Sequence, residues 1–278
     1  MVRFFVAPDV LSTTEICLTG EVAHQIARVL RMRPGDRVLL LDGQGYEYHI
    51  RLLRFGRDRL WGEVVGRTRP ATESACRVDL YLSVLNKPDK FEWALQKCTE
   101  LGAARFVPVI AHRSVAAPPN HNRYERWQKI VREAAEQSGR TVLPSLQEAV
   151  TFTEAISLEA RRLNGASSAG GPDAYRSGNN HSSNDSDDSG SDAPHVAFMP
   201  SPGAGMPLAN AIGVIRTDGR GGSVSIFIGP EGGFTEDELA EAQENGLLLV
   251  SLGPRTLRAE TAAVAALTMV LYELGQLG

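Results

Sequence analysis

The stretch VSIFIGPEGGFTEDELAEA, Val224–Ala242, joins an apolar run, a glycine-rich turn and a polar segment. This order predicts a buried strand, a sharp loop and a helix, and Thr235 with Glu238 forms a capping-box pattern at the helix start. Three glycines in the turn let backbone amides approach a ligand closely: Gly229, Gly232 and Gly233. The turn lacks the spacing of dinucleotide-binding and nucleoside-triphosphate-binding loops. By itself it fits either a ligand-binding loop or a structural turn.

A second stretch of the same design follows. LLLVSLGPRTLRAETAAVAAL, Leu247–Leu267, is again an apolar strand, a glycine-containing loop and a helix, with Arg255 and Arg258 in the loop and Glu260 at the helix start. Two adjacent units of this kind present their loops at the same sheet edge. Charged groups beside exposed amides there predict a pocket for a polar ligand. The final helix is apolar on nearly every face, which indicates burial in the domain or in a subunit interface.

The chain around these two units alternates strands with longer amphipathic helices from about residue 73 onward. This alternation predicts an α/β domain with a mostly parallel sheet that helices cover on both faces, and a ligand at the carboxyl ends of the strands. The further strands are expected at Val78–Leu85, Arg105–Ile110 and His195–Pro200. The helices are expected at Lys90–Leu101, Arg123–Gln137, Thr151–Leu163, Glu236–Asn245 and Thr261–Leu274.

Residues 1–72 predict a small β-rich domain, with strands at Phe4–Ala7, Val38–Leu41, Tyr46–Leu53 and Leu60–Val65. One helix is expected in EVAHQIARVLRM, Glu21–Met32, with an apolar face of Val22, Ile26, Val29 and Leu30. His24, Arg28 and Arg31 then share the opposite face. That face is either an ordinary solvated surface or a surface that contacts phosphates. Eleven arginines against eight acids make this domain modestly basic, which is compatible with a nucleic-acid partner.

Residues 164–193 contain no Leu, Ile, Val or Phe, so this stretch predicts a disordered surface insertion. Its five acids and one arginine account for the whole net charge of -4. The remaining composition, 42% hydrophobic and 22% charged, is typical of a globular protein. Cys17, Cys76 and Cys98 are too widely spaced for a zinc site or a disulfide framework, so no metal is expected. No signal peptide or membrane span is recognisable, which favours a cytoplasmic location.

IGPEGG followed by LGPRTLRAET resembles the SPOUT superfamily of S-adenosylmethionine-dependent RNA methyltransferases. Within it, the sequence is similar to the RsmE family, which methylates N3 of a uridine in 16S ribosomal RNA of the small subunit. HQIARVLRM, Pro34-Gly35 and LDG resemble the family's N-terminal PUA-like domain, and KFEWALQKCTELG and RWQKIVREAAEQSGR resemble its central segments. The resemblance covers nearly the whole chain, and the insertion at 164–193 is its one departure.

The resemblance implies a PUA-like RNA-binding β-barrel domain at 1–72 and a SPOUT methyltransferase domain at 73–278, with a C-terminal trefoil knot. It also implies a homodimer and S-adenosyl-L-methionine as cofactor. Carried over by position, the cofactor contacts come from the end of one strand and from both glycine loops. They are Met199, Pro200, Ile228, Gly229, Pro230, Glu231, Gly232, Gly233, Leu252, Gly253, Pro254, Thr256, Leu257 and Arg258.

Methyl transfer to uridine N3 requires an unpaired base and help with its proton. Arg258 is the candidate to stabilise negative charge on the uracil carbonyls, with a structural ion pair as the alternative. Glu260 is a candidate base or orienting partner, or else only a charge at a helix start. Glu231 either faces the cofactor or fixes its loop. The expected RNA contacts are Arg3, His24, Arg28, Arg31, Lys90 and Arg140, of which the last two are otherwise solvated charges.

Two other functions remain open from the sequence. One is a SPOUT methyltransferase that acts on another RNA position, such as a ribose 2′-hydroxyl. The other is a non-catalytic RNA-binding factor in ribosome assembly. The PUA-like start and the EQSGR element argue against the first, and the two intact glycine loops argue against the second.

Overall fold

The computed structural model describes residues 1–165, 194–213, 215 and 222–277. The predicted insertion lies outside the described residues, except for Asn164 and Gly165. The chain forms two compact units. The first comprises residues 1–74, 92–105 and 119–146, and the second comprises residues 75–91, 106–118 and 147–278. The domain boundary expected after residue 72 stays a prediction.

The first unit contains a five-stranded sheet in the order β1-β3-β4-β5-β2. Its strands are β1 (Arg3–Phe5), β2 (Glu15–Thr19), β3 (Arg37–Leu41), β4 (Glu47–Phe55) and β5 (Arg59–Thr68). β1 pairs with β3 in parallel and the other pairs are antiparallel. The β-rich character of this region is therefore confirmed. The sequence interpretation missed β2, although Ile16 and Leu18 alternate into the core.

The remaining elements of the first unit are mostly helical. They are the 3₁₀ turn η1 (Pro8–Leu11), α1 (Gly20–His24), the π-helical turn η2 (Gln25–Val29), α3 (His121–Ser138) and the short strand β8 (Ser145–Leu146). α2 (Pro88–Leu101) is divided between the units: its residues up to Phe91 belong to the second unit, and those from Glu92 onward belong to the first. Gly139 ends α3 in a left-handed conformation with φ 80°, which glycine adopts at no steric cost.

The single helix expected at Glu21–Met32 is wrong in its second half. After His24 the chain widens into η2, where the Leu30 amide donates to the Gln25 carbonyl over five residues. This wider turn rotates the following residues off the core, so Val29 and Leu30 are 64% and 41% exposed. Ile26 is buried as expected, and Ala23, which was not expected there, is buried with it.

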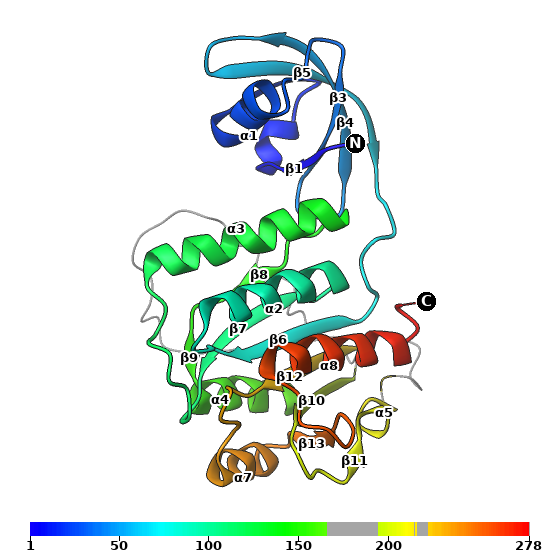
Figure 1. The fold of residues 1–278 in the computed structure, drawn as a ribbon. Helices are drawn as coiled ribbons and strands as arrows, with labels where there is room; N and C mark the ends of the chain where they lie inside the picture. The colour runs from blue at the N-terminus through cyan, green and yellow to red at the C-terminus, as the bar shows by residue number, and fades with distance from the viewer. Residues whose placement is uncertain (166–193, 214, 216–221, 278) are drawn as a thin grey trace. The chain divides into compact units, whose positions relative to one another are not determined.

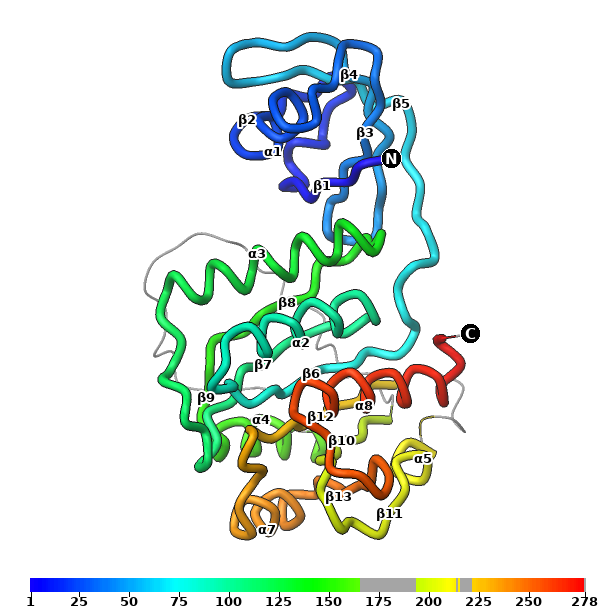
Figure 2. Tube along the Cα trace, viewed as in Figure 1, coloured from blue at the N-terminus to red at the C-terminus, as the bar shows by residue number. Residues whose placement is uncertain are grey.

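The second unit is built on a parallel sheet in the order β11-β13-β10-β12-β6-β7, with β9 beside β7 (Figure 1). Its strands are β6 (Arg77–Ser83), β7 (Arg105–Ile110), β9 (Val150–Thr151), β10 (His195–Pro200), β11 (Met206–Pro207), β12 (Ser223–Ile228) and β13 (Leu248–Ser251). β12 lies between β6 and β10, so segments far apart in the sequence run side by side (Figure 2). The predicted mostly parallel sheet is confirmed, and the trefoil knot stays a prediction.

Helices cover the sheet of the second unit. They are α4 (Phe152–Leu163), α5 (Leu208–Ala211), α7 (Glu236–Glu244) and α8 (Ala259–Glu273). α4 and α7 pack on the face where the rings of Tyr81 and Phe227 stack 4.1 Å apart. Leu80 and Ile226 alternate to the opposite face and are fully buried there, so both faces are covered as expected. α8 packs against β12 and β6.

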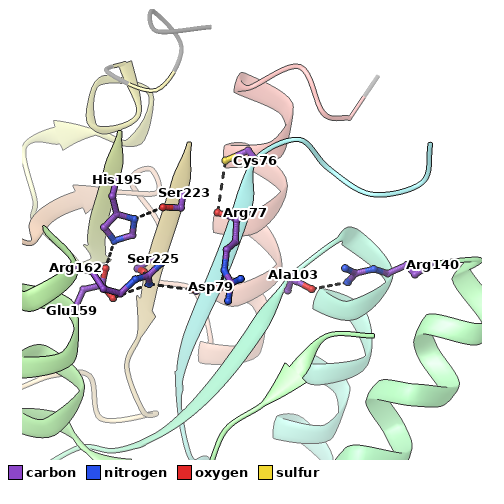
Figure 3. Close-up of polar contacts among 10 residues, drawn as sticks. All are labelled: Cys76, Arg77, Asp79, Ala103, Arg140, Glu159, Arg162, His195, Ser223 and Ser225. Atoms are coloured by element: carbon purple, nitrogen blue, oxygen red, sulfur yellow. Dashed lines mark hydrogen bonds and ion pairs between the residues drawn. The ribbon is translucent and has the colours of Figure 1, made fainter. Parts of the chain in front are cut away.

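A buried polar network ties the end of α4 to the beginning of the strands (Figure 3). Glu159 accepts a short hydrogen bond from His195, whose other ring nitrogen lies 2.7 Å from Ser223 Oγ. Arg162 donates to Asp79 over 3.0 Å and to Ser225 over 3.2 Å. His195 and Ser223 begin β10 and β12. The described residues on both sides of 166–193 are thus joined at the amino ends of the strands.

Burial alone raises the pKa of the Glu159 carboxyl, because the charged form loses its hydration. The hydrogen bond from His195 and the positive charges of His195 and Arg162 outweigh this effect. They hold the pKa of Glu159 below its ordinary value, so this carboxylate stays charged inside the unit.

Candidate functional site

A cavity of about 960 Å³ opens in the second unit at the carboxyl ends of the parallel strands. Its walls come from the loops that follow β6, β7, β10, β12 and β13, and from the start of α8. In a parallel sheet all these loops emerge at one edge, which is why a ligand site forms there. The network of Glu159 and His195 lies at the opposite ends of the strands.

Both glycine loops contribute to this one cavity. Ten of the predicted cofactor residues line it: Pro200, Ile228, Gly229, Pro230, Glu231, Gly232, Gly233, Thr256, Leu257 and Arg258. Four others do not line it: Met199, Leu252, Gly253 and Pro254. Met199 is fully buried in the hydrophobic core, because strand alternation turns its side chain into the sheet–helix interface.

The IGPEGG loop forms a tight turn. The Gly233 amide donates to the Pro230 carbonyl over 2.9 Å, and Gly233 has φ 67°, which favours glycine. A Cβ atom on Gly229 would lie 3.1 Å from the Phe234 ring. Among the described residues, the amides of Glu231 and Gly232 have no acceptor. The turn therefore offers two backbone donors to a ligand.

The sequence interpretation missed the contributions of two other loops. Asn86 and Lys87 follow β6, and Arg113 and Val115 follow β7, and all four line the cavity. The Asn86 amide donates to Glu231 Oε1 over 3.0 Å, so the Glu231 carboxylate fixes its loop. The signal was present, because the same rule that placed the glycine loops applies to every parallel strand that ends at this edge.

The second glycine loop brings charged groups to the wall of the cavity. Arg258 caps the N-terminus of α8 and is exposed, and its side chain has no hydrogen-bond or ion-pair partner within the described part of the chain. Glu260 is 7% exposed in the first turn of α8, and its Oε1 lies 3.4 Å from Lys90 Nζ. The side chain that could form a structural ion pair is thus Glu260 rather than Arg258.

The predicted RNA contacts of the first unit are only partly on one surface. His24 and Arg28 are exposed on α1 and η2. Arg31 is exposed but follows η2 with φ 52°, so it does not share the helix face as expected. Arg3 is about one-third exposed, and its Nε donates to Glu47 over 3.2 Å.

Arg140 is a correction. It was expected to reach RNA or solvent, but it is 5% exposed inside the first unit. Its guanidinium donates to the Thr99 carbonyl over 3.2 Å, to the Ala103 carbonyl over 2.6 Å and to Glu73 over 2.7 Å. Figure 3 shows its contact with Ala103. These partners occupy the guanidinium, so Arg140 is not available to contact RNA.

Within the described residues, no cluster of three or more His, Cys, Asp or Glu side chains could hold a metal ion. None of the helices described is both long and apolar enough to cross a membrane.

The chain matches the family model of an RNA methyltransferase domain at residues 72–170 and 185–271. It matches the model of an RNA methyltransferase PUA domain at residues 18–65. These matches, with which the parallel sheet and its loop-walled cavity are consistent, place the chain in the class of RNA methyltransferases.

Individual relatives narrow this class. "Ribosomal RNA small subunit methyltransferase E" of Bacillus subtilis is 32% identical over 259 residues, which cover 92% of this chain and 89% of the relative. The protein of the same name from Synechocystis is 31% identical, over 96% of this chain and 76% of the relative. A crystal structure of the Neisseria gonorrhoeae protein bound to S-adenosyl methionine is 27% identical, with a TM-score of 0.77 over 98% and 97% of the two chains. The chain belongs to the ribosomal RNA small subunit methyltransferase E family, which confirms the resemblance in its sequence.

Proposed function

We propose that the cavity binds S-adenosyl-L-methionine and that the protein methylates N3 of a uridine in 16S ribosomal RNA of the small subunit. One observation carries this proposal: two glycine loops, one after β12 and one after β13, form one cavity, and at its wall lies Arg258, whose side chain has no partner among the described residues. The names of the relatives and the bound S-adenosyl methionine of the Neisseria gonorrhoeae protein support it.

The residues present fit such a cofactor. A volume of about 960 Å³ is at the upper end of the range for small-molecule sites and leaves room for a base beside the cofactor. The free amides of Glu231 and Gly232 provide hydrogen-bond donors. Leu239 and Val115 provide apolar surface for the uncharged parts of the ligand.

The bound cofactor supplies a methyl group on a sulfonium, which a nucleophile attacks in line. Uridine N3 carries a proton and is a poor nucleophile until that proton is lost to solvent, which leaves the negative charge on the uracil ring. Within the part of the chain that the structure describes, no acidic side chain neutralises the guanidinium of Arg258, so it can stabilise that charge on a uracil carbonyl. The loop position of Arg258, fixed by the start of α8, provides the orientation that the transfer requires.

Glu260 and Lys90 act as a pair in this proposal. The carboxylate lies in the first turn of α8, where the helix dipole favours negative charge, and the Lys90 ammonium is 3.4 Å away. This contact favours an orienting role for Glu260 over that of a base. Lys90 lies in the cavity lining, so its expected contact with RNA is a contact near the target nucleotide.

We assign the remaining RNA contacts to the first unit. His24, Arg28 and Arg31 are exposed basic side chains, and all three lie within residues 18–65, which match the PUA domain model. Arg3 contributes with the guanidinium atoms that Glu47 does not occupy. Such contacts to phosphates position an RNA without reading its sequence.

We also propose a homodimer in the cytoplasm. On α8, Met269 and Tyr272 are 38% and 67% exposed beside a fully buried stripe of the same helix. Large side chains three residues apart on the exposed side of this helix are a surface that a second copy would cover. Light scattering of the purified protein tests this, with twice the chain mass of 30.1 kDa as the expected result.

Three variants test the catalytic assignment: Arg258→Ala, Glu260→Ala and, as a matched control, Arg255→Ala in the same loop. Methylation of small ribosomal subunits is measured together with S-adenosylmethionine binding by calorimetry. Arg258→Ala should lose most of the turnover while it still binds the cofactor, because it acts on the uracil. Glu260→Ala should lose less, because it acts through Lys90. Full turnover in Arg258→Ala would remove that residue from catalysis.

A further inference from the structure

The turn at Pro230–Gly233 is held in one orientation by contacts from outside its own strand and helix. Within the turn, the peptide group between Gly232 and Gly233 is planar, so its carbonyl and its amide cannot rotate independently. The amide of this peptide, on Gly233, donates to the Pro230 carbonyl over 2.9 Å. A second hydrogen bond, to the Gly232 carbonyl at the other end of the same peptide group, would fix the orientation of the peptide plane.

Arg113, in the loop after β7, donates that hydrogen bond. Its Nη1 donates to the Gly232 carbonyl over 3.0 Å and to the Phe234 carbonyl over 3.3 Å. The side chain also packs along the turn, because a Cβ atom built on Gly232 would lie 3.3 Å from Arg113 Cβ and 3.5 Å from its Cδ. Glycine at 232 therefore leaves room for the Arg113 side chain to pack closely along the turn.

The loop that carries Arg113 is itself held in place. The amide of His112 donates to Glu238 Oε1 over 2.8 Å, while Glu238 Oε2 accepts from the Thr235 amide over 2.8 Å in the capping box of α7. The amide of Ala111 donates to Ser114 Oγ over 3.1 Å. Arg113 thus reaches the turn from a support fixed to the same helix that the turn leads into.

The geometry of the contact suits an arginine. Arg113 pairs with two carbonyls and, among the described residues, with no carboxylate, so its charge is not neutralised by an acid. A guanidinium holds several donors in a rigid plane, whereas a lysine ammonium is a point donor on a flexible stem. Arg113 is also exposed, so its loss removes little buried surface from the core of the unit.

We propose that Arg113 is a positioning residue for the cofactor turn. By holding the Gly232–Gly233 peptide, it keeps the free amides of Glu231 and Gly232 in the orientation that binds the cofactor before the cofactor arrives. This inference rests on the proposed function of the cavity as the S-adenosylmethionine site. Arg113 acts through the turn and has no direct part in methyl transfer.

The test measures S-adenosylmethionine binding by calorimetry for the full-length wild type, Arg113→Ala, Arg113→Lys and the control Arg126→Ala, which removes an exposed arginine of the first unit. Loss of a charge-assisted hydrogen bond predicts a dissociation constant about tenfold higher for Arg113→Ala. Arg113→Lys should recover part of the affinity because it can hold one carbonyl. Arg126→Ala should match the wild type.

Steady-state kinetics separate positioning from a direct RNA contact. Arg113→Ala should raise the KM for S-adenosylmethionine and leave the KM for small ribosomal subunits unchanged. An unchanged cofactor affinity with a raised KM for the subunits would overturn the inference and leave the proposed function intact. If alanine also lowers the melting temperature, the lysine variant decides: partial recovery of affinity supports positioning, and affinity equal to that of alanine overturns it. A wild type without cofactor binding would contradict the proposed function, and this inference with it.

Discussion

Arg140→Met removes the buried guanidinium that holds the interior of the first unit together. The variant loses the hydrogen bonds to the Thr99 and Ala103 carbonyls and the ion pair with Glu73 at 2.7 Å. Breaking a buried ion pair from one side costs about 3–5 kcal/mol, because the remaining charge is left without its partner. Glu73 is 25% exposed and keeps the backbone amides of Thr141 and Val142 as donors, which favours the lower end, about 3 kcal/mol.

Thermal unfolding followed by circular dichroism measures this loss. For a chain of this size, about 3 kcal/mol corresponds to a fall in Tm of about 6–12 °C. The matched control is Arg126→Met, which removes an arginine with the same 2.7 Å distance to its glutamate but with a side chain 68% exposed. Water reaches the Arg126 guanidinium, although the Glu92 side chain is only 12% exposed, so the control should lose clearly less in Tm than Arg140→Met.

Two results would refute the reasoning about Arg140. Equal melting temperatures for the two variants would show that burial does not make this pair important. A folded Arg140→Met protein with weakened binding to ribosomal RNA, and an unchanged melting temperature, would return Arg140 to the RNA-binding surface.

The remaining predictions concern the cofactor turn and the buried network. In Gly232→Val the Cβ atom alone would lie 3.3 Å from Arg113, and the two methyl groups add to this crowding. Calorimetry should therefore show lost S-adenosylmethionine binding in a protein whose circular dichroism matches the wild type. Unchanged affinity would refute the placement of the turn. Glu159→Gln removes a carboxylate whose pKa is held below its ordinary value by His195 and Arg162 despite the opposing effect of burial. Because the pKa of Glu159 is lower in the folded protein than in the unfolded chain, the charged carboxylate stabilises the fold at pH values above the ordinary pKa of about 4.3. This stabilisation is lost as the pH falls through the pKa of the folded protein. The difference in melting temperature between wild type and Glu159→Gln should therefore be full at neutral pH and narrow below about pH 4. A difference that stays constant from pH 7 to pH 3 would contradict the assignment.

The parts of the fold that the sequence predicted well are those set by local pattern. Val224–Ala242 carries a buried strand, a glycine turn and a capping box in succession, and each has a local physical cause. The structure has β12 at Ser223–Ile228 and α7 at Glu236–Glu244, within a residue of the expected bounds. The common edge of the two glycine loops followed from the parallel sheet, which alternation of strands and helices indicated.

The parts that the sequence could not predict depend on residues far apart in the chain. Arg140 reads as a surface charge because its partner Glu73 is 67 residues away. The helix widens after His24, where Ile26 packs in the core among residues distant in the chain, whereas periodicity alone assumes regular helical turns. Arg113 was missed for a different reason. Its loop contains no glycine, and the sequence prediction considered only the glycine-rich loops at this edge of the sheet.

The most direct test of the account is the identity of the methylated nucleoside. Small ribosomal subunits that lack the modification are incubated with the protein and S-adenosylmethionine, and the 16S ribosomal RNA is digested and analysed by mass spectrometry with nucleoside standards. The account predicts a single new product, N3-methyluridine, whose amount is strongly reduced in the reaction with Arg258→Ala. Methylation of a ribose 2′-hydroxyl, or no methylation by a protein that binds the cofactor, would contradict it.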